Sequence, residues 1–152
     1  MQARLQLDVT YSARRPWAPT VRELRAWTLA ALAARREPSI ALDVHVVGSL
    51  RSRGLNARYR GKDRPTNVLS FAGAGTSPHG RRHIGELVIC APVVAREARE
   101  QGKTLAQHWA HMTVHGVLHL LGFDHERAVE ARKMAATEVQ ILDQLGFSDP
   151  YL

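Results

Sequence analysis

Cysteine is almost absent from this sequence, because Cys90 is the only one among 152 residues. A single cysteine cannot form an intrachain disulfide, so a hydrophobic core must hold the fold, and a reducing compartment is expected. Long hydrophobic runs are missing as well. The N-terminus lacks the apolar centre of a signal peptide, and no stretch approaches the roughly 20 apolar residues of a membrane helix. We therefore expect a cytoplasmic protein that does not bind membranes.

Aromatic residues are scarce, and acidic residues are outnumbered. Phe, Trp and Tyr together make up 6% of the chain. None is clearly exposed for base stacking, so strong sequence readout of a nucleic acid is not expected. The chain has 21 Lys and Arg against 14 Asp and Glu, a net charge of +7. This excess favours a polyanionic partner, although net charge alone is equally compatible with a basic, well-solvated surface.

Hydrophobic periodicity predicts one α+β domain that spans residues 1–152. Alternating apolar residues predict four strands, at 5–10, 42–47, 68–71 and 84–91. Helices are expected at about 20–36, 49–57, 92–101, 104–121 and 126–145. In the short helix 49–57, Leu50 and Leu55 should face inward. Because strands and helices alternate irregularly, we expect a small mixed four-stranded sheet covered by helices.

The most informative stretch is a histidine motif that runs from His115 through His119 and Gly122 to His125. A helix rises about 1.5 Å and turns about 100° per residue, so His115 and His119 stack on one face roughly 6 Å apart. Gly122 permits the left-handed turn that ends a helix, and the reversed chain can bring His125 back to the same ion. Three imidazoles with an open fourth position are typical of a catalytic zinc site. The motif therefore predicts one Zn²⁺ per chain, bound by these three histidines.

Three further residues have side chains of a ligand type but are expected to play other roles. Cys90 is expected to be a small buried hydrophobe. His45 belongs to the polar face of a predicted strand. His111 precedes His115 by one helical turn, so a ligand or supporting role is conceivable, but packing or hydrogen bonding is the favoured interpretation.

The residue after the first histidine of the motif helps to distinguish between possible substrate classes. Zinc proteases with the same ligand spacing carry a Glu there as the general base. In this sequence the position is Gly116. Peptide hydrolysis is therefore poorly supported. Phosphodiester cleavage makes different demands, because an Arg and a metal can stabilise the charge that develops on phosphate oxygens.

A basic segment could supply that Arg. Six cations fall within 14 residues: Arg51, Arg53, Arg58, Arg60, Lys62 and Arg64. We expect residues 59–67 to form a turn leading into a strand, where loop residues are well placed for binding. In this interpretation Arg60 grips the scissile phosphate, and Arg58, Lys62 and Arg64 hold the flanking backbone.

Several stretches together resemble the bacterial YbeY endoribonuclease family. They are Leu55-Asn56, Tyr59 to Asp63, Pro65 to Phe71, and His108 to Met112 running into the histidine motif. Ile84-Gly85-Glu86 differs from the Leu-Gly-Asp expected in that family. The resemblance implies a cytoplasmic α+β zinc-dependent RNase, specific for single strands, that acts in ribosomal RNA maturation, including the small-subunit 3′ end, and in ribosome quality control. It also implies a metal triad at His115, His119 and His125 and a functional Arg60.

Three functions follow from these observations. The leading hypothesis is a metal-dependent endoribonuclease whose partners are ribosomal RNA and ribosomal particles, with a ribosomal protein or an assembly GTPase as further partners. The second is a non-catalytic ribosome-assembly factor that uses zinc only for folding. A metalloprotease comes third, because it would need a base from outside the motif.

Overall fold

The computed structural model describes residues 4–37, 39–124 and 126–152 of the chain. Its elements follow the predicted alternation of strands and helices. In chain order they are β1 (Arg4–Tyr11), α1 (Val21–Ala34), β2 (Ser39–Val47), α2 (Ser49–Arg60), β3 (Val68–Ala72), β4 (Arg82–Cys90), α3 (Ala91–Glu100), α4 (Leu105–Leu120) and α5 (Ala128–Gln144). Capping boxes begin α1 and α4, at Thr20 with Glu23 and at Thr104 with Gln107.

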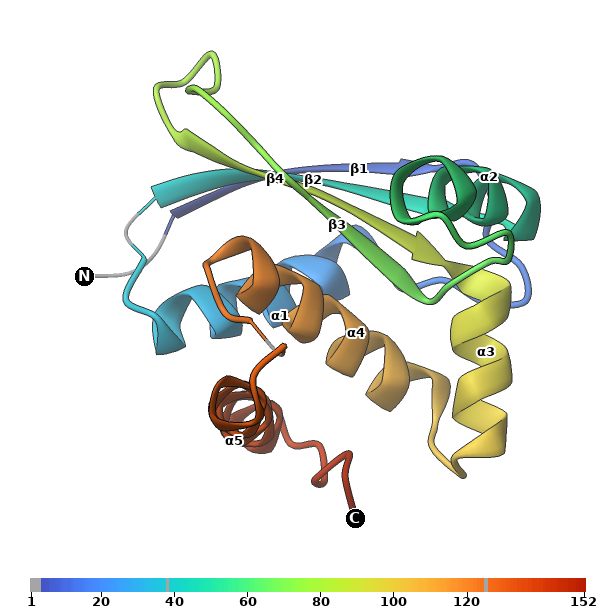
Figure 1. Cartoon of the computed structure of the whole chain (residues 1–152). Coiled ribbons are helices and arrows are strands. Elements are labelled where there is room, and N and C mark those ends of the chain that lie inside the picture. The colour runs from blue at the N-terminus through green and yellow to red at the C-terminus, as the bar shows by residue number, and fades with distance from the viewer. Residues whose placement is uncertain (1–3, 38, 125) are drawn as a thin grey trace.

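The strands form one mixed sheet in the order β1-β2-β4-β3. β1, β2 and β4 run parallel, and β3 pairs antiparallel with β4 and forms an edge. Figure 1 shows α1, α4 and α5 on one face of the sheet and α2 on the other. The predicted α+β architecture, with a small mixed four-stranded sheet covered by helices, is confirmed. Among the described residues no helix is both long and apolar enough to span a membrane.

Two hydrophobic clusters, one on each face, hold the helices to the sheet. Alternate residues of β4 separate between them, as expected for a strand buried on both sides. Leu87 and Ile89 belong to the main core under α1, α4 and α5, whereas Val88 and Cys90 belong to the smaller cluster on the α2 face. Cys90 is 1% exposed, which confirms its expected role as a buried hydrophobe.

Helix α2 differs from the prediction in its length and in its buried face. It extends to Arg60 and ends at Gly61, which adopts the left-handed conformation at φ 71°. Arg58 and Arg60 therefore lie in its last turn, not in a loop, because no residue before Gly61 interrupts the helix. The inward orientation predicted for Leu50 was wrong, since this side chain is 85% exposed. Leu55 does pack against the smaller cluster.

The buried face of α2 is polar and holds the loop that follows the helix. Ser52 and Asn56, one turn apart, are its buried residues. The Ser52 hydroxyl donates to the Thr66 carbonyl at 3.0 Å and accepts from the Thr66 amide at 2.9 Å. The Asn56 amide donates to the Arg64 carbonyl at 2.8 Å. These bonds satisfy the loop backbone and fix the path of the chain from α2 into β3.

Candidate active site

Helix α4 presents its histidines in a row along one side. The ring centroids of His111 and His115 lie 6.3 Å apart, and those of His115 and His119 lie 4.8 Å apart. His115 and His119 line a cavity of about 350 Å³. The predicted stacking of these two residues on one helical face is therefore observed. His125, the third predicted ligand, lies outside the described residues.

Gly116 faces the sheet and allows α4 to approach it closely. A Cβ atom at this position would lie 2.7 Å from Leu87 Cδ2 and 3.3 Å from Val68 Cγ2. Leu87 is fully buried, so it has little room to move. The position that holds the general base in zinc proteases thus lies at the helix-to-sheet contact, and a side chain there would have to displace Leu87.

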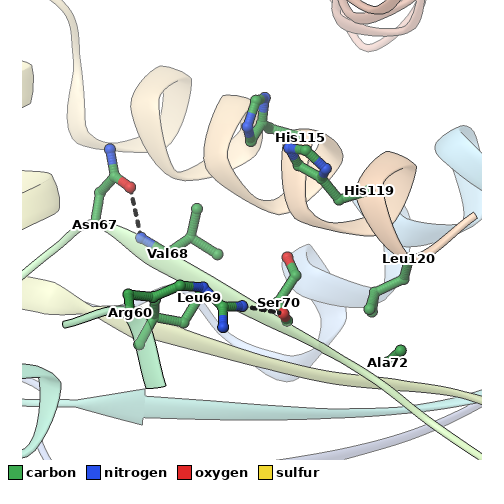
Figure 2. Close-up of a pocket in the computed structure, with 9 residues that line it drawn as sticks. All are labelled: Arg60, Asn67, Val68, Leu69, Ser70, Ala72, His115, His119 and Leu120. Atoms are coloured by element: carbon green, nitrogen blue, oxygen red, sulfur yellow. Dashed lines mark hydrogen bonds between the residues drawn. The ribbon is translucent and has the colours of Figure 1, made fainter. Parts of the chain in front are cut away.

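Arg60 reaches the same cavity from the opposite side, as Figure 2 shows. Its Nη2 donates to the Ser70 carbonyl at 3.0 Å, and its guanidinium lies 5.3 Å from the Phe71 ring centroid. Both contacts are with β3, so the edge strand orients the guanidinium. The cavity therefore combines two imidazoles with a cation, a set of groups suited to an anionic substrate.

The other predicted cations do not line this cavity. Arg58, Lys62 and Arg64 are all exposed, on the last turn of α2 and on the loop after it. Arg53 is held in a two-bond ion pair with Asp63, at 2.8 and 3.1 Å. Arg58, Lys62 and Arg64 are thus exposed on the helix end and loop next to Arg60, whereas Arg53 is already paired within the protein.

Tyr59 corrects the expectation that no aromatic side chain is exposed. It is 49% exposed and packs edge-to-face against Phe71, with ring centroids 5.2 Å apart. The Arg58 guanidinium lies 5.3 Å from the Tyr59 ring centroid. Glu86 and His45 line a second cavity with these two rings, on the α2 face of the sheet. Glu86 therefore lies on the opposite face of the sheet from His115 and His119 of α4.

Asn67, the last residue of the segment 59–67, also lines the cavity, although no role was predicted for its side chain. Its side-chain amide donates to Glu97 Oε1 at 3.0 Å, and Glu97 Oε1 also hydrogen-bonds with His108 Nε2 at 2.8 Å. Burial raises the pKa of Glu97, but the hydrogen bonds with His108 and Asn67 outweigh it, so the pKa lies below its ordinary value of 4.5. These contacts join α3 and α4 to the start of β3, which forms the floor of the cavity.

Glu138 is a second residue that the sequence did not reveal. Its carboxylate is buried on α5 and hydrogen-bonds with His115 Nδ1 at 2.5 Å. His111 Nε2 lies 3.5 Å from the same oxygen, and the Tyr151 hydroxyl donates to the other oxygen. Burial raises the pKa of Glu138, but hydrogen bonds with His111 and His115 lower it more, to about 2. Burial and the bond to Glu138 raise the pKa of Tyr151.

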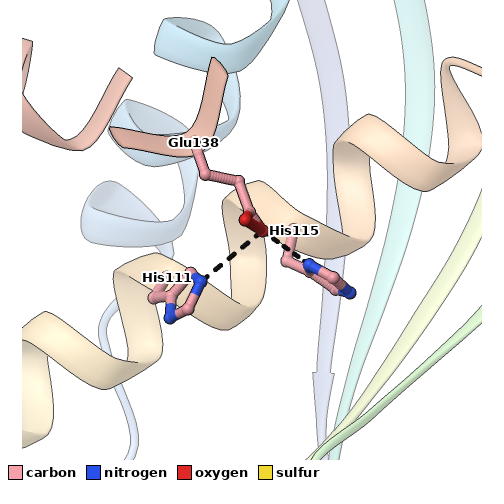
Figure 3. A group of neighbouring side chains, drawn as sticks. All are labelled: His111, His115 and Glu138. Atoms are coloured by element: carbon pink, nitrogen blue, oxygen red, sulfur yellow. Dashed lines mark hydrogen bonds and ion pairs between the residues drawn. The ribbon is translucent and has the colours of Figure 1, made fainter. Parts of the chain in front are cut away.

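Two groups of side chains near His115 could hold a metal ion. The ligand atoms of His111, His115 and Glu138 all lie within 4.8 Å of one another, so this group could hold an ion (Figure 3). The expected hydrogen bonding of His111 is observed, since its Nε2 lies 3.3 Å from the Tyr151 hydroxyl. The imidazoles that face the cavity shared with Arg60, His115 and His119, are also chemically suited to zinc.

The fold and the cavity together define a class of protein: a small α+β domain in which paired helix histidines and an arginine from the opposite side line one pocket. A family model described as Endoribonuclease YbeY matches residues 13–146. The Endoribonuclease YbeY of Alkalilimnicola ehrlichii is 53% identical, over 97% of this chain and 91% of that protein. The Endoribonuclease YbeY of Stenotrophomonas maltophilia is 50% identical, over 97% and 94%. The chain belongs to the YbeY endoribonuclease family.

A solved structure supports the fold. The solution structure of TM1509 from Thermotoga maritima matches with a TM-score of 0.59 at 22% identity, and the match covers 93% of this chain and 92% of that one. Family membership supports a nuclease of the hydrolase class, with RNA as the substrate.

Proposed function

We propose that this chain is a zinc-dependent endoribonuclease that cleaves single-stranded RNA during ribosomal RNA maturation, including the small-subunit 3′ end, and in ribosome quality control. The observation that carries the proposal is that Arg60, His115 and His119 line one cavity although they are far apart in the sequence. We take residues 1–152 as one such domain, acting in the cytoplasm on ribosomal RNA and ribosomal particles. A ribosomal protein or an assembly GTPase would deliver the substrate.

In this proposal His115, His119 and His125 hold one Zn²⁺ ion. When bound at an open three-histidine site, zinc lowers the pKa of water from 15.7 to about 7 and polarises a substrate oxygen. Arg60 holds the scissile phosphate with its guanidinium, which is positioned by the Ser70 carbonyl and the Phe71 ring. Charge-assisted bonds of this kind stabilise the negative charge that grows on the phosphate oxygens during cleavage.

The exposed cations Arg58, Lys62 and Arg64 hold the flanking RNA backbone. They lie on the same end of α2 as Arg60 and on the loop fixed by Ser52 and Asn56, so a strand bound in the cavity passes them. Contacts to phosphates position a nucleic acid without reading its sequence. We therefore expect cleavage to depend on single-strandedness and position more than on base identity.

The test is cleavage of a single-stranded ribosomal RNA fragment by the purified protein, with and without a chelator. Chelation, His115→Ala and Arg60→Ala should each lower the cleavage rate by at least about 100-fold, since each removes stabilisation specific to the transition state. Arg22→Ala, an exposed arginine on α1, is the matched control and should retain the wild-type rate. Metal-independent cleavage, or equal rates for Arg60→Ala and Arg22→Ala, would exclude the proposal.

The alternative is an assembly factor in which zinc serves folding alone. It predicts that chelation unfolds the protein and that folded, metal-free variants still bind RNA. Neither these variants nor the zinc-bound wild type should cleave the RNA. The same preparations therefore separate the two functions when binding and cleavage are both measured. A metalloprotease remains the third hypothesis, and the close packing at Gly116 gives it no base from within the motif.

A further inference from the structure

We propose that Glu138 is a positioning residue for the zinc site. In this inference, which rests on the proposed metal site, the Glu138 carboxylate accepts the Nδ1–H of His115. The neutral ring then carries its proton on Nδ1, and Nε2 is the nitrogen that binds the ion. Tyr151, near the C-terminus, holds the carboxylate in place through its hydroxyl.

The distance between the two groups favours a hydrogen bond over shared coordination. His115 Nδ1 and Glu138 Oε1 are 2.5 Å apart. Two ligands about 2.0–2.1 Å from one tetrahedral zinc ion would be separated by about 3.3 Å. An ion therefore does not fit between this nitrogen and this oxygen. Figure 3 shows the other ring nitrogen of His115 pointing away from Glu138, and His115 lines the cavity that Arg60 also lines.

The carboxylate is held from several directions, so it can fix the ring of His115. Its side chain is 1% exposed. One oxygen contacts His115 and His111 of α4, and the other accepts the Tyr151 hydroxyl. Lys103 Nζ donates to the Pro150 carbonyl at 2.8 Å and thereby anchors the C-terminal segment. A buried carboxylate is costly unless it is hydrogen-bonded, and these contacts supply the bonds.

The decisive measurement needs no variant. Long-range ¹H–¹⁵N correlation spectra of histidine-labelled protein, recorded without metal and with zinc, report which ring nitrogen carries the proton. The expected result is a His115 ring protonated at Nδ1 in both states, with only the Nε2 resonance shifting when zinc binds. A His115 ring that binds zinc through Nδ1, or that carries its proton on Nε2 in the metal-free protein, would overturn the inference.

Variants provide a second test with zinc affinity as the readout, measured by competition with a chromophoric chelator. Glu138→Ala should weaken zinc binding by about 10–100-fold, the usual cost of losing a supporting group behind a histidine ligand. Glu138→Gln keeps an acceptor oxygen and should recover part of this loss. Asp143→Asn removes an exposed carboxylate from the same helix and should bind zinc as the wild type does.

Tyr151→Phe keeps the measurement informative if removal of the buried carboxylate prevents folding. It deletes only the hydroxyl on a half-exposed side chain and should weaken zinc binding, by less than Glu138→Ala does. Equal zinc affinities for Tyr151→Phe, Asp143→Asn and the wild type would contradict the positioning of Glu138 by the Tyr151 hydroxyl. Zinc binding is measured without RNA, so a protein with the expected tautomer but no cleavage would refute the proposed function and leave this inference standing.

Discussion

At the scale of single residues, Gly116 shows how packing and chemistry constrain one position. The size of the residue at position 116 determines how closely α4 packs on the sheet. The same position carries the general base in zinc proteases. A Cβ atom there would lie 2.7 Å from Leu87, which is closer than side chains tolerate. Close packing of α4 on the sheet therefore favours glycine over a residue with a side chain at this position.

A pair of glycine substitutions tests this explanation. Gly54 lies inside α2, where an added Cβ atom would meet nothing within 4 Å, so Gly54→Ala should stabilise the protein by about 0.8–1 kcal/mol through helix propensity. Gly116→Ala has the same propensity gain, but overpacking costs about 1–3 kcal/mol. We expect a net loss for Gly116→Ala in urea unfolding. Equal stabilisation by both changes would show that α4 is not tightly packed at this point.

Glu97 predicts a pH dependence of stability. Its pKa in the folded protein lies below the ordinary 4.5 because bonds with His108 and Asn67 outweigh burial. A lowered folded pKa means that its contribution is fully present above the unfolded value and is lost as the pH falls through the folded value. The free energy of unfolding should therefore decrease below about pH 4.5. Glu97→Gln should be less stable at pH 7 and show a shallower decrease, whereas an unchanged slope would contradict this account.

At the scale of elements, the end of α2 brings an aromatic ring and several cations to the edge of the sheet. Residues expected in a turn belong to a helix that continues to Gly61. Continuing the helix exposes Tyr59 beside Phe71 and directs Arg60 to the cavity on the opposite face of β3. This helix end is therefore the natural surface for RNA that leads to the histidines.

Tyr59 should stack on a base of the bound RNA. Base stacking on an aromatic side chain contributes about 1–3 kcal/mol by alanine substitution, so Tyr59→Ala should weaken binding of a single-stranded oligonucleotide by about 5–150-fold. Tyr59→Phe keeps the ring and should bind as the wild type does. Fluorescence anisotropy with metal-free protein measures binding without cleavage. Unchanged affinity of Tyr59→Ala would place the RNA elsewhere.

At the scale of the whole molecule, only some of the positive charges are available to bind phosphates. The net charge is +7, and six of the cations lie on α2 and the loop after it. The Arg53–Asp63 ion pair removes one of them from the set that can meet phosphates. Five cations, Arg51, Arg58, Arg60, Lys62 and Arg64, are then exposed to solvent on α2 and on the loop after it.

These five cations predict the salt dependence of RNA binding. If each contacts one phosphate, the slope of log K against log salt should be about −3.5 for single-stranded RNA. Arg64→Ala should make the slope shallower by about 0.7, and Arg22→Ala should leave it unchanged. Anisotropy titrations at several salt concentrations provide the slopes. A flat response would show that the α2 end is only solvated surface.

Local patterns in the sequence were sufficient for the order of the elements and for part of the site, but not for the length of α2. Periodicity predicted the strands and helices, including helix starts near 20 and 104, and the four-residue spacing placed His115 and His119 on one face. These features depend on neighbours within one or two turns. The roles of Arg60 and the three predicted zinc ligands remain proposals.

Only the tertiary structure decided which distant segments meet. Glu138 follows His115 by 23 residues and belongs to another helix, so no spacing rule connects them. The link from Asn67 through Glu97 to His108 and the packing of Gly116 on Leu87 depend likewise on how α3, α4 and the sheet fit together. The sequence by itself determined the histidine row on one helix. The fold determined its neighbours, because contacts between distant segments are set by close packing of whole elements.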